Sequence, residues 1–95
     1  MDFSIDAELQ ADHDRLRAFV RDEIVPLEAD RKNYDSYGNI DMGVLQTLRA
    51  KVKAAGLWAP QIPREQGGLG YAPTGMAVLY EAMNYSIFGP VAFNC

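Results

Sequence analysis

The chain has little of several features that mark whole classes of protein. A single cysteine, Cys95, among 95 residues cannot form a disulfide within the chain, which fits a reducing compartment. No apolar run comes near the ~20 residues that span a bilayer, so we expect no membrane span. There is no excess of positive charge, and the net charge of -4 argues against nucleic acid as the main partner.

The first residues also lack a targeting signal. Residues 1–6 are acidic and have neither the apolar core of a signal peptide nor the arginines of a transit peptide. The sequence therefore predicts a cytoplasmic protein.

The length limits the chemistry that the chain can hold. Ninety-five residues make one small domain, 1–95, because domains usually have about 100–200 residues. A domain of this size buries only roughly 60–65% of its unfolded surface. This leaves little room for both a core and an enclosed active site, so we expect the chain to be part of a larger protein.

Apolar residues recur at helical spacing in three segments, which predicts three main helices. The first runs from Ser4 or Asp6, either of which can cap it, to about Val25. Pro26 disfavours helical geometry at Val25, so we expect a break or kink there and then a short helical turn over residues 27–31. The apolar stripes are Leu9, Leu16, Phe19, Val20 and Ile24 in the first segment, Leu45, Leu48, Val52 and Ala55 in the second, and Met76, Leu79, Tyr80 and Met83 in the third.

Proline and glycine punctuate the rest of the chain. The second helix is expected from Asp41, its cap, to Ala55, with Gly56 as the left-handed stop. A loop precedes it, and a Pro/Gly-rich connection follows it as far as Pro73, which opens the third helix. Pro90 opens a fourth helix that the chain end truncates. The sequence thus predicts an all-α, small up-down helical domain with three main helices and a truncated fourth.

Charge is unevenly distributed. Residues 1–30 contain nine acidic and three basic side chains, whereas residues 31–64 contain six basic and two acidic ones. Two interpretations stay open: two solvated helix faces, or faces that attract each other or a partner domain.

Side chains that could carry chemistry are few. His13, the sole histidine, borders an apolar stripe, and its neighbours Asp12 and Asp14 fall on other helix faces, so we expect a structural or interfacial residue. It lacks a second histidine or a nearby cysteine for a metal site. Glu81 is a candidate for a half-buried ion pair with an arginine. We therefore predict no catalytic and no metal-ligating residue.

The glycines of residues 67–70 resemble a phosphate loop only superficially. No Lys-Ser/Thr pair follows them and no strand precedes them. We expect these glycines to provide positive φ or close backbone packing instead, and we predict no cofactor-binding residue. The aromatic residues Trp58, Phe88 and Phe93 are expected in the core or on an interdomain surface.

Two motifs, in this order, resemble the acyl-CoA dehydrogenase family. Residues 22–30 read DEIVPLEAD, like the end of the family's first helix, and residues 56–70 read GLWAPQIPREQGGLG, like its next signature. Arg64 and Gln66 stand where Glu and Tyr are commoner, and residues 80–82 keep one glutamate of a usual Glu-Glu-Leu.

This resemblance implies a larger parent enzyme. Members of the family have an N-terminal helical domain, a middle β domain and a C-terminal helical bundle. FAD lies between the last two, with help from a neighbouring subunit, which implies a homo-oligomer. A glutamate of the C-terminal domain removes the α-proton of the acyl-CoA substrate, and the flavin takes the β-hydride. The chain resembles only the first domain, so we expect no FAD binding and no activity from it alone.

The resemblance also suggests a substrate contact. In the family, the helix after the Glu-Glu-Leu helix lines the tunnel for the acyl tail. The candidates for the tunnel wall are Pro90, Val91, Phe93 and Asn94. Ordinary packing against the missing domains is the alternative for these residues.

A second interpretation of the whole chain is a stand-alone helical protein-interaction module without enzymatic activity. Continuation of the gene beyond Cys95 into a β-rich segment would favour the enzyme, whereas a stop codon there would favour the module.

Overall fold

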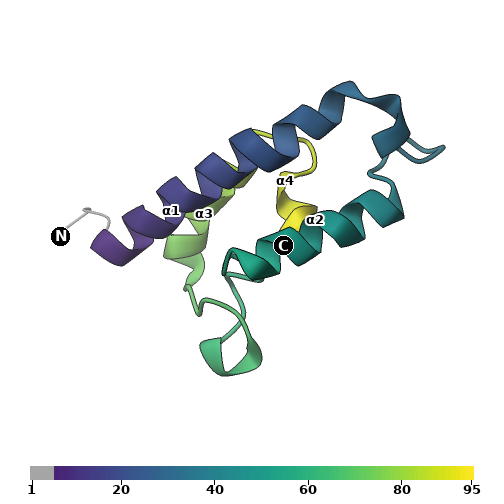
Figure 1. Ribbon diagram of the computed structural model, residues 1–95. Coiled ribbons are helices and arrows are strands. Elements are labelled where there is room, and N and C mark those ends of the chain that lie inside the picture. The colour runs from purple at the N-terminus through teal and green to yellow at the C-terminus, as the bar shows by residue number, and fades with distance from the viewer. Residues whose placement is uncertain (1–5) are drawn as a thin grey trace.

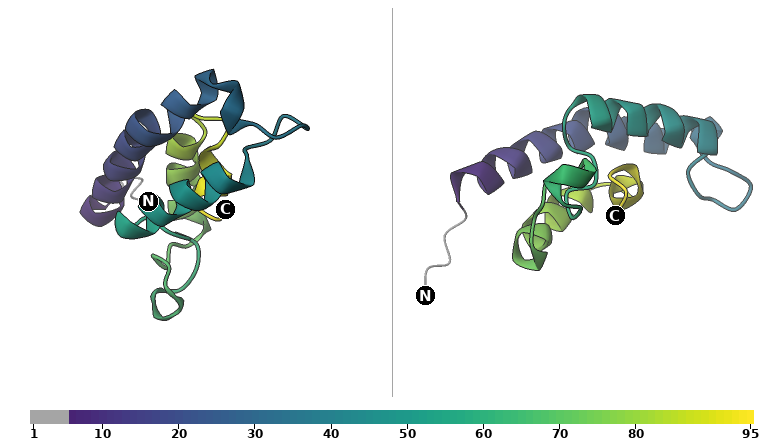
Figure 2. Two further views of the ribbon diagram at one scale, coloured as in Figure 1. Left: turned by 45° about the vertical axis from the view of Figure 1, so that its right-hand side comes forward. Right: turned by 90° about the horizontal axis from the view of Figure 1, so that it is seen from below.

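The computed structural model describes residues 6–95, which form an elongated all-α domain of 47 × 25 × 20 Å. The helical elements in chain order are α1 (Ala7–Phe19), η1 (Val20–Ile24), η2 (Val25–Ala29), η3 (Arg31–Asn33), α2 (Met42–Ala54), η4 (Arg64–Gln66), α3 (Pro73–Met83) and α4 (Gly89–Ala92). Figure 1 shows that α1, η1 and η2 make one long rod, beside which α2 returns. The helix α3 packs against the first part of this rod, and α4 packs against α2 and α3 (Figure 2). The prediction of an all-α domain is confirmed.

The rod begins as the sequence predicts. The Asp6 side chain accepts a hydrogen bond from the Leu9 backbone N–H at 2.8 Å, which caps the helix. The alternative cap, Ser4, lies outside the described residues. From this start, Leu9 and Leu16 turn toward the core on one face of α1.

The break or kink expected at Val25 is a change of helix type, and the short helical turn expected over residues 27–31 starts at Val25 and ends at Ala29. Before Pro26 the helix widens, and the Val25 N–H donates to the Val20 carbonyl five residues back. Proline lacks an N–H and crowds the carbonyl four residues before it, and a wider turn relieves both problems. The rod therefore continues through Pro26 to Ala29 as 3-10 helix, and Asp30 is extended before η3.

The second helix matches its prediction closely. Asp41 caps α2 through the Val44 N–H at 3.1 Å, and Gly56 has φ +73°, in the left-handed region. The preceding loop contains an isolated antiparallel bridge between Tyr34 and Ile40, and no strand occurs within residues 6–95.

The Pro/Gly-rich connection between α2 and α3 is compact for two different reasons. Gly67 and Gly70 have φ of +95° and +75°, which favours glycine. Gly68 has no space for a side chain, because a Cβ there would lie 2.1 Å from the Ile62 carbonyl oxygen. Both expected roles of these glycines are thus confirmed, and Pro73 opens α3 as predicted.

One core joins all four α-helices. It contains Leu9, Leu16, Val20, Ile24, Leu48, Val52, Leu57, Met76, Leu79, Ala82, Met83, Phe88, Ala92 and Phe93. The aliphatic stripes from the sequence supply most of it, whereas Tyr80 is exposed and Trp58 is half-buried. Among the described residues, no helix is both long and apolar enough to cross a membrane.

Candidate functional site

The α4 segment carries the candidates for the tunnel wall, and the structure separates them into two groups. The Phe93 side chain is fully buried, and its ring meets that of Phe19 edge-on at 5.9 Å between centroids. Pro90 and Val91 are half-buried, and Asn94 is exposed. Phe93 therefore belongs to the core of the domain, and the other three have surface left for a partner or ligand.

The α4 turn is closed by its own backbone. The Cys95 N–H donates to the Pro90 carbonyl at 2.9 Å, and the Asn94 N–H donates to the Val91 carbonyl at 3.3 Å. Asn94 has φ +64°, the left-handed conformation that this helix ending requires. The turn thus has a defined end within the described residues.

Three carbonyl groups of this segment are bonded to α2 and the connection after it. The Arg49 side chain donates to the Val91 carbonyl through Nε at 3.1 Å and Nη2 at 2.8 Å. The Ala59 N–H donates to the Phe93 carbonyl at 2.9 Å, and Gln61 Nε2 donates to the Asn94 carbonyl at 2.7 Å. The α4 segment is therefore fixed on its inner side.

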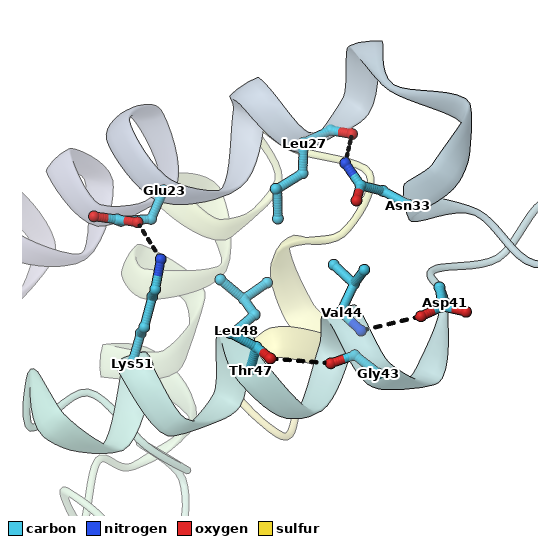
Figure 3. Close-up of a pocket in the computed structure, with 9 residues that line it drawn as sticks. All are labelled: Glu23, Leu27, Asn33, Asp41, Gly43, Val44, Thr47, Leu48 and Lys51. Atoms are coloured by element: carbon cyan, nitrogen blue, oxygen red, sulfur yellow. Dashed lines mark hydrogen bonds and ion pairs between the residues drawn. The ribbon is translucent and has the colours of Figure 1, made fainter.

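A groove of about 410 Å³ lies between the second part of the rod and α2 (Figure 3). Leu27 extends from the rod, and Val44 and Leu48 extend from α2 toward it. Lys51 and Glu23 form an ion pair at 3.2 Å at one end. The groove is mainly apolar. The Thr47 hydroxyl donates to the Gly43 carbonyl, and the Asp41 carboxylate accepts from the Val44 N–H, so neither is paired with a second side chain as a nucleophile and its base would be.

The helices α1 and α3 are linked by a polar cluster around His13. His13 Nε2 lies 2.9 Å from Glu81 Oε2, and its Nδ1 lies 3.1 Å from Asp14 Oδ1. Glu81 is exposed and also accepts a hydrogen bond from the Tyr85 hydroxyl. Glu81 therefore pairs with His13 and not with an arginine, and Asp14 does reach the ring of His13, contrary to the sequence-based expectation.

Hydrogen bonds set the charge state of this cluster. The protonated His13 ring donates to the Glu81 and Asp14 carboxylates, and these hydrogen bonds, the one to Glu81 above all, raise the pKa of His13, although burial opposes them. The bond to His13 lowers the pKa of Glu81 and that of Asp14. The cluster thus favours a protonated His13 between two carboxylates, which suits a structural contact better than a general base.

Ion pairs join the acidic rod to the basic segments that follow it in the sequence. Glu8 pairs with Arg64 of the connection, and Glu23 pairs with Lys51 of α2. Attraction between the acidic and basic segments is thus present. These side chains are exposed, however, so each pair contributes little to stability.

The glycine connection does not fit the pyrophosphate of FAD. The Gly67, Gly68 and Gly70 amides donate to the carbonyls of Arg64, Pro63 and Ile62, respectively. A phosphate loop needs such amides free to point at the ligand, and these are used inside the turn. Among the described residues, no group of three or more His, Cys, Asp or Glu side chains is placed to hold a metal ion.

Sequence reasoning missed the residues that hold α4. Arg49 and Gln61 lie 42 and 33 positions before their acceptors, so neither spacing nor periodicity connects them. The one available signal was the place of Arg49 near the apolar stripe of its helix, where a cation is unusual without a partner.

The comparison with known families agrees with the motifs and the fold. The sequence matches the family model described as "Acyl-CoA dehydrogenase, N-terminal domain" over residues 6–94. No significant match was found among curated proteins or among solved structures. Because the family match covers nearly the whole chain, the chain belongs to the acyl-CoA dehydrogenase family, as its N-terminal domain.

Proposed function

We propose that the chain is the N-terminal helical domain of an FAD-dependent enzyme that oxidises an acyl-CoA thioester between its α and β carbons. The observation that carries this proposal is the family match over residues 6–94. In the proposal, middle β and C-terminal helical domains of the parent, expected to be a homo-oligomer, hold FAD and the catalytic base. The glycine connection of this chain, whose amides are already bonded, has no part in holding FAD.

The contribution of this domain is part of the wall of the acyl pocket. The surface of α4 formed by Pro90, Val91 and Asn94 is the proposed contact, because these residues keep exposed area while their inner side is bonded to α2 and the connection. Phe93 supports this surface from within the core. An acyl tail is bound by apolar area at about 25 cal/mol per Å², so the bulk of these residues selects among chain lengths.

The enzymatic part is tested on the purified full-length parent. We expect a flavin absorption spectrum and anaerobic bleaching of that spectrum on addition of an acyl-CoA. A parent that carries no flavin, or whose flavin is not bleached by acyl-CoAs of short, medium or long chain, would overturn the proposal.

The pocket-wall part is tested separately with Val91→Phe in the same parent. The added bulk is expected to lower kcat/KM for long acyl chains more than for short ones. A difference of one methylene in an apolar pocket is worth about 1–3 kcal/mol, so the shift should be graded. Val25→Phe is the matched control, because Val25 is a partly exposed valine on the rod outside the α4 segment. If Val91→Phe has the same chain-length profile as the control Val25→Phe, α4 does not form part of the pocket wall.

A further inference from the structure

Arg49 makes the most directed contact between α2 and α4. Its half-buried guanidinium gives two hydrogen bonds, of 3.1 and 2.8 Å, to one acceptor, the Val91 carbonyl oxygen. That carbonyl lies in the last turn of α4, at the negative end of the short helix. A cation at this end is favourable, and charged donors make the stronger class of hydrogen bond.

The direction of the Arg49 side chain is itself constrained. Its guanidinium carbon lies 5.4 Å from the centre of the Trp58 ring, within the range of a cation–π contact. Lys53 approaches the same ring, with Nζ 4.5 Å from the centre. Of Arg49 and Lys53, only Arg49 also forms hydrogen bonds to α4 within the described residues.

We propose that Arg49 is a positioning residue for acyl-chain selectivity: it fixes α4, and with it the Val91 side chain, at a set distance from the rest of the pocket. This inference rests on the proposed function, because it takes the outer surface of α4 as part of the acyl-pocket wall. The carbonyl and the side chain that Arg49 places belong to the same residue, so a shift of this carbonyl displaces the proposed wall directly.

Two chemical features separate positioning from general stabilisation. Lysine is a point charge with no planar fork, so Arg49→Lys cannot reproduce the two bonds that converge on one carbonyl oxygen. Methionine keeps the length and apolar stem of the side chain and removes every donor. Lys53→Met removes a cation from the same Trp58 ring without touching α4 and is therefore the matched control.

The experiment uses the full-length enzyme with two readouts. Hydrogen exchange of the peptide that contains the Asn94 and Cys95 amides reports whether the α4 turn stays closed. The ratio of kcat/KM for a long to a short acyl-CoA reports the position of the wall. We expect Arg49→Met to speed the exchange about tenfold or more, as the loss of a charge-assisted bond implies, and to change the ratio. Arg49→Lys should give intermediate values, and Lys53→Met should change neither.

The outcomes distinguish this inference from the proposed function. The inference is overturned if Arg49→Met and Lys53→Met have the same hydrogen-exchange rate in the α4 peptide and the same ratio of kcat/KM for long and short acyl-CoA. It is also overturned if Arg49→Met speeds the exchange but leaves the kcat/KM ratio unchanged. In either case the wall still stands if Val91→Phe shifts the chain-length profile. If Arg49→Met does not fold, Arg49→Lys decides the question. A faster exchange and a changed kcat/KM ratio in Arg49→Lys support the inference, and values equal to those of the parent overturn it.

Discussion

A methyl group at Gly68 is expected to damage the fold more than the same group at Gly67, although the two glycines are adjacent. A Cβ at Gly68 would lie 2.1 Å from the Ile62 carbonyl oxygen and 2.4 Å from that of Ala59. Both oxygens are in use, since they accept hydrogen bonds from the Gly70 N–H at 2.8 Å and the Ile62 N–H at 3.0 Å. Relief of the clash must therefore stretch or break at least one of these bonds.

The magnitude follows from these two effects. Overpacking in a filled site costs about 1–3 kcal/mol, and one lost backbone bond costs about 1 kcal/mol more. We expect Gly68→Ala to lower the free energy of unfolding by about 2–4 kcal/mol. At Gly67 the space is open, and only the φ of +95° opposes a side chain, so Gly67→Ala should cost about 1 kcal/mol.

Urea and thermal unfolding of the 95-residue chain, followed by circular dichroism, measure this difference. For a domain of this size, each kcal/mol shifts Tm by about 4–8 °C, so the two variants are readily separated. Gly67→Asn is a further control, because asparagine tolerates the left-handed conformation and should be milder than alanine. If Gly68→Ala were no less stable than Gly67→Ala, the packing argument for this turn would be wrong.

Two further predictions concern the contacts of the long rod and of α2. Because the pKa of His13 is raised on folding, its contribution to stability is complete below the unfolded pKa of about 6.5 and is lost as pH rises through the folded pKa. Because the pKa values of Glu81 and Asp14 are lowered on folding, their contribution is lost as pH falls through their folded pKa values. Stability from this cluster should thus be greatest in mildly acidic solution, and His13→Gln should flatten the Tm–pH curve above about pH 6; a curve unchanged by the substitution would contradict the pairing. Asp41→Ala removes the side chain that accepts from the Val44 N–H and should cost about 1 kcal/mol in urea unfolding, whereas Asp41→Asn should be almost neutral.

The sequence predicted best what depends on neighbours along the chain. The caps at Asp6 and Asp41, the left-handed stop at Gly56 and the start of α3 at Pro73 all follow from local backbone chemistry, and the structure has each of them. The wider turn of residues 20–24 was missed, because a proline excludes the ordinary α-helical bond but still permits a wider turn before it.

The contacts that define the candidate site depend instead on residues far apart in the chain. Glu81 meets His13 because α1 and α3 lie side by side, and the distance along the sequence gives no sign of this pairing. The same holds for Arg49 and Val91. Phe93 shows the limit of residue type, since an aromatic side chain near a chain end suits a pocket wall and a core equally, and only the packing on Phe19 places it in the core.

The most direct test of the account is a crystal structure of the full-length parent with a bound acyl-CoA. We predict FAD held outside this domain, Phe93 packed on Phe19, and the acyl tail in van der Waals contact, within about 4.5 Å, with the outer surface of α4 at Val91. An acyl tail bound away from α4, with Pro90, Val91 and Asn94 covered by another domain, would contradict the role in the pocket wall. A parent structure with no flavin site would contradict the proposed enzyme itself.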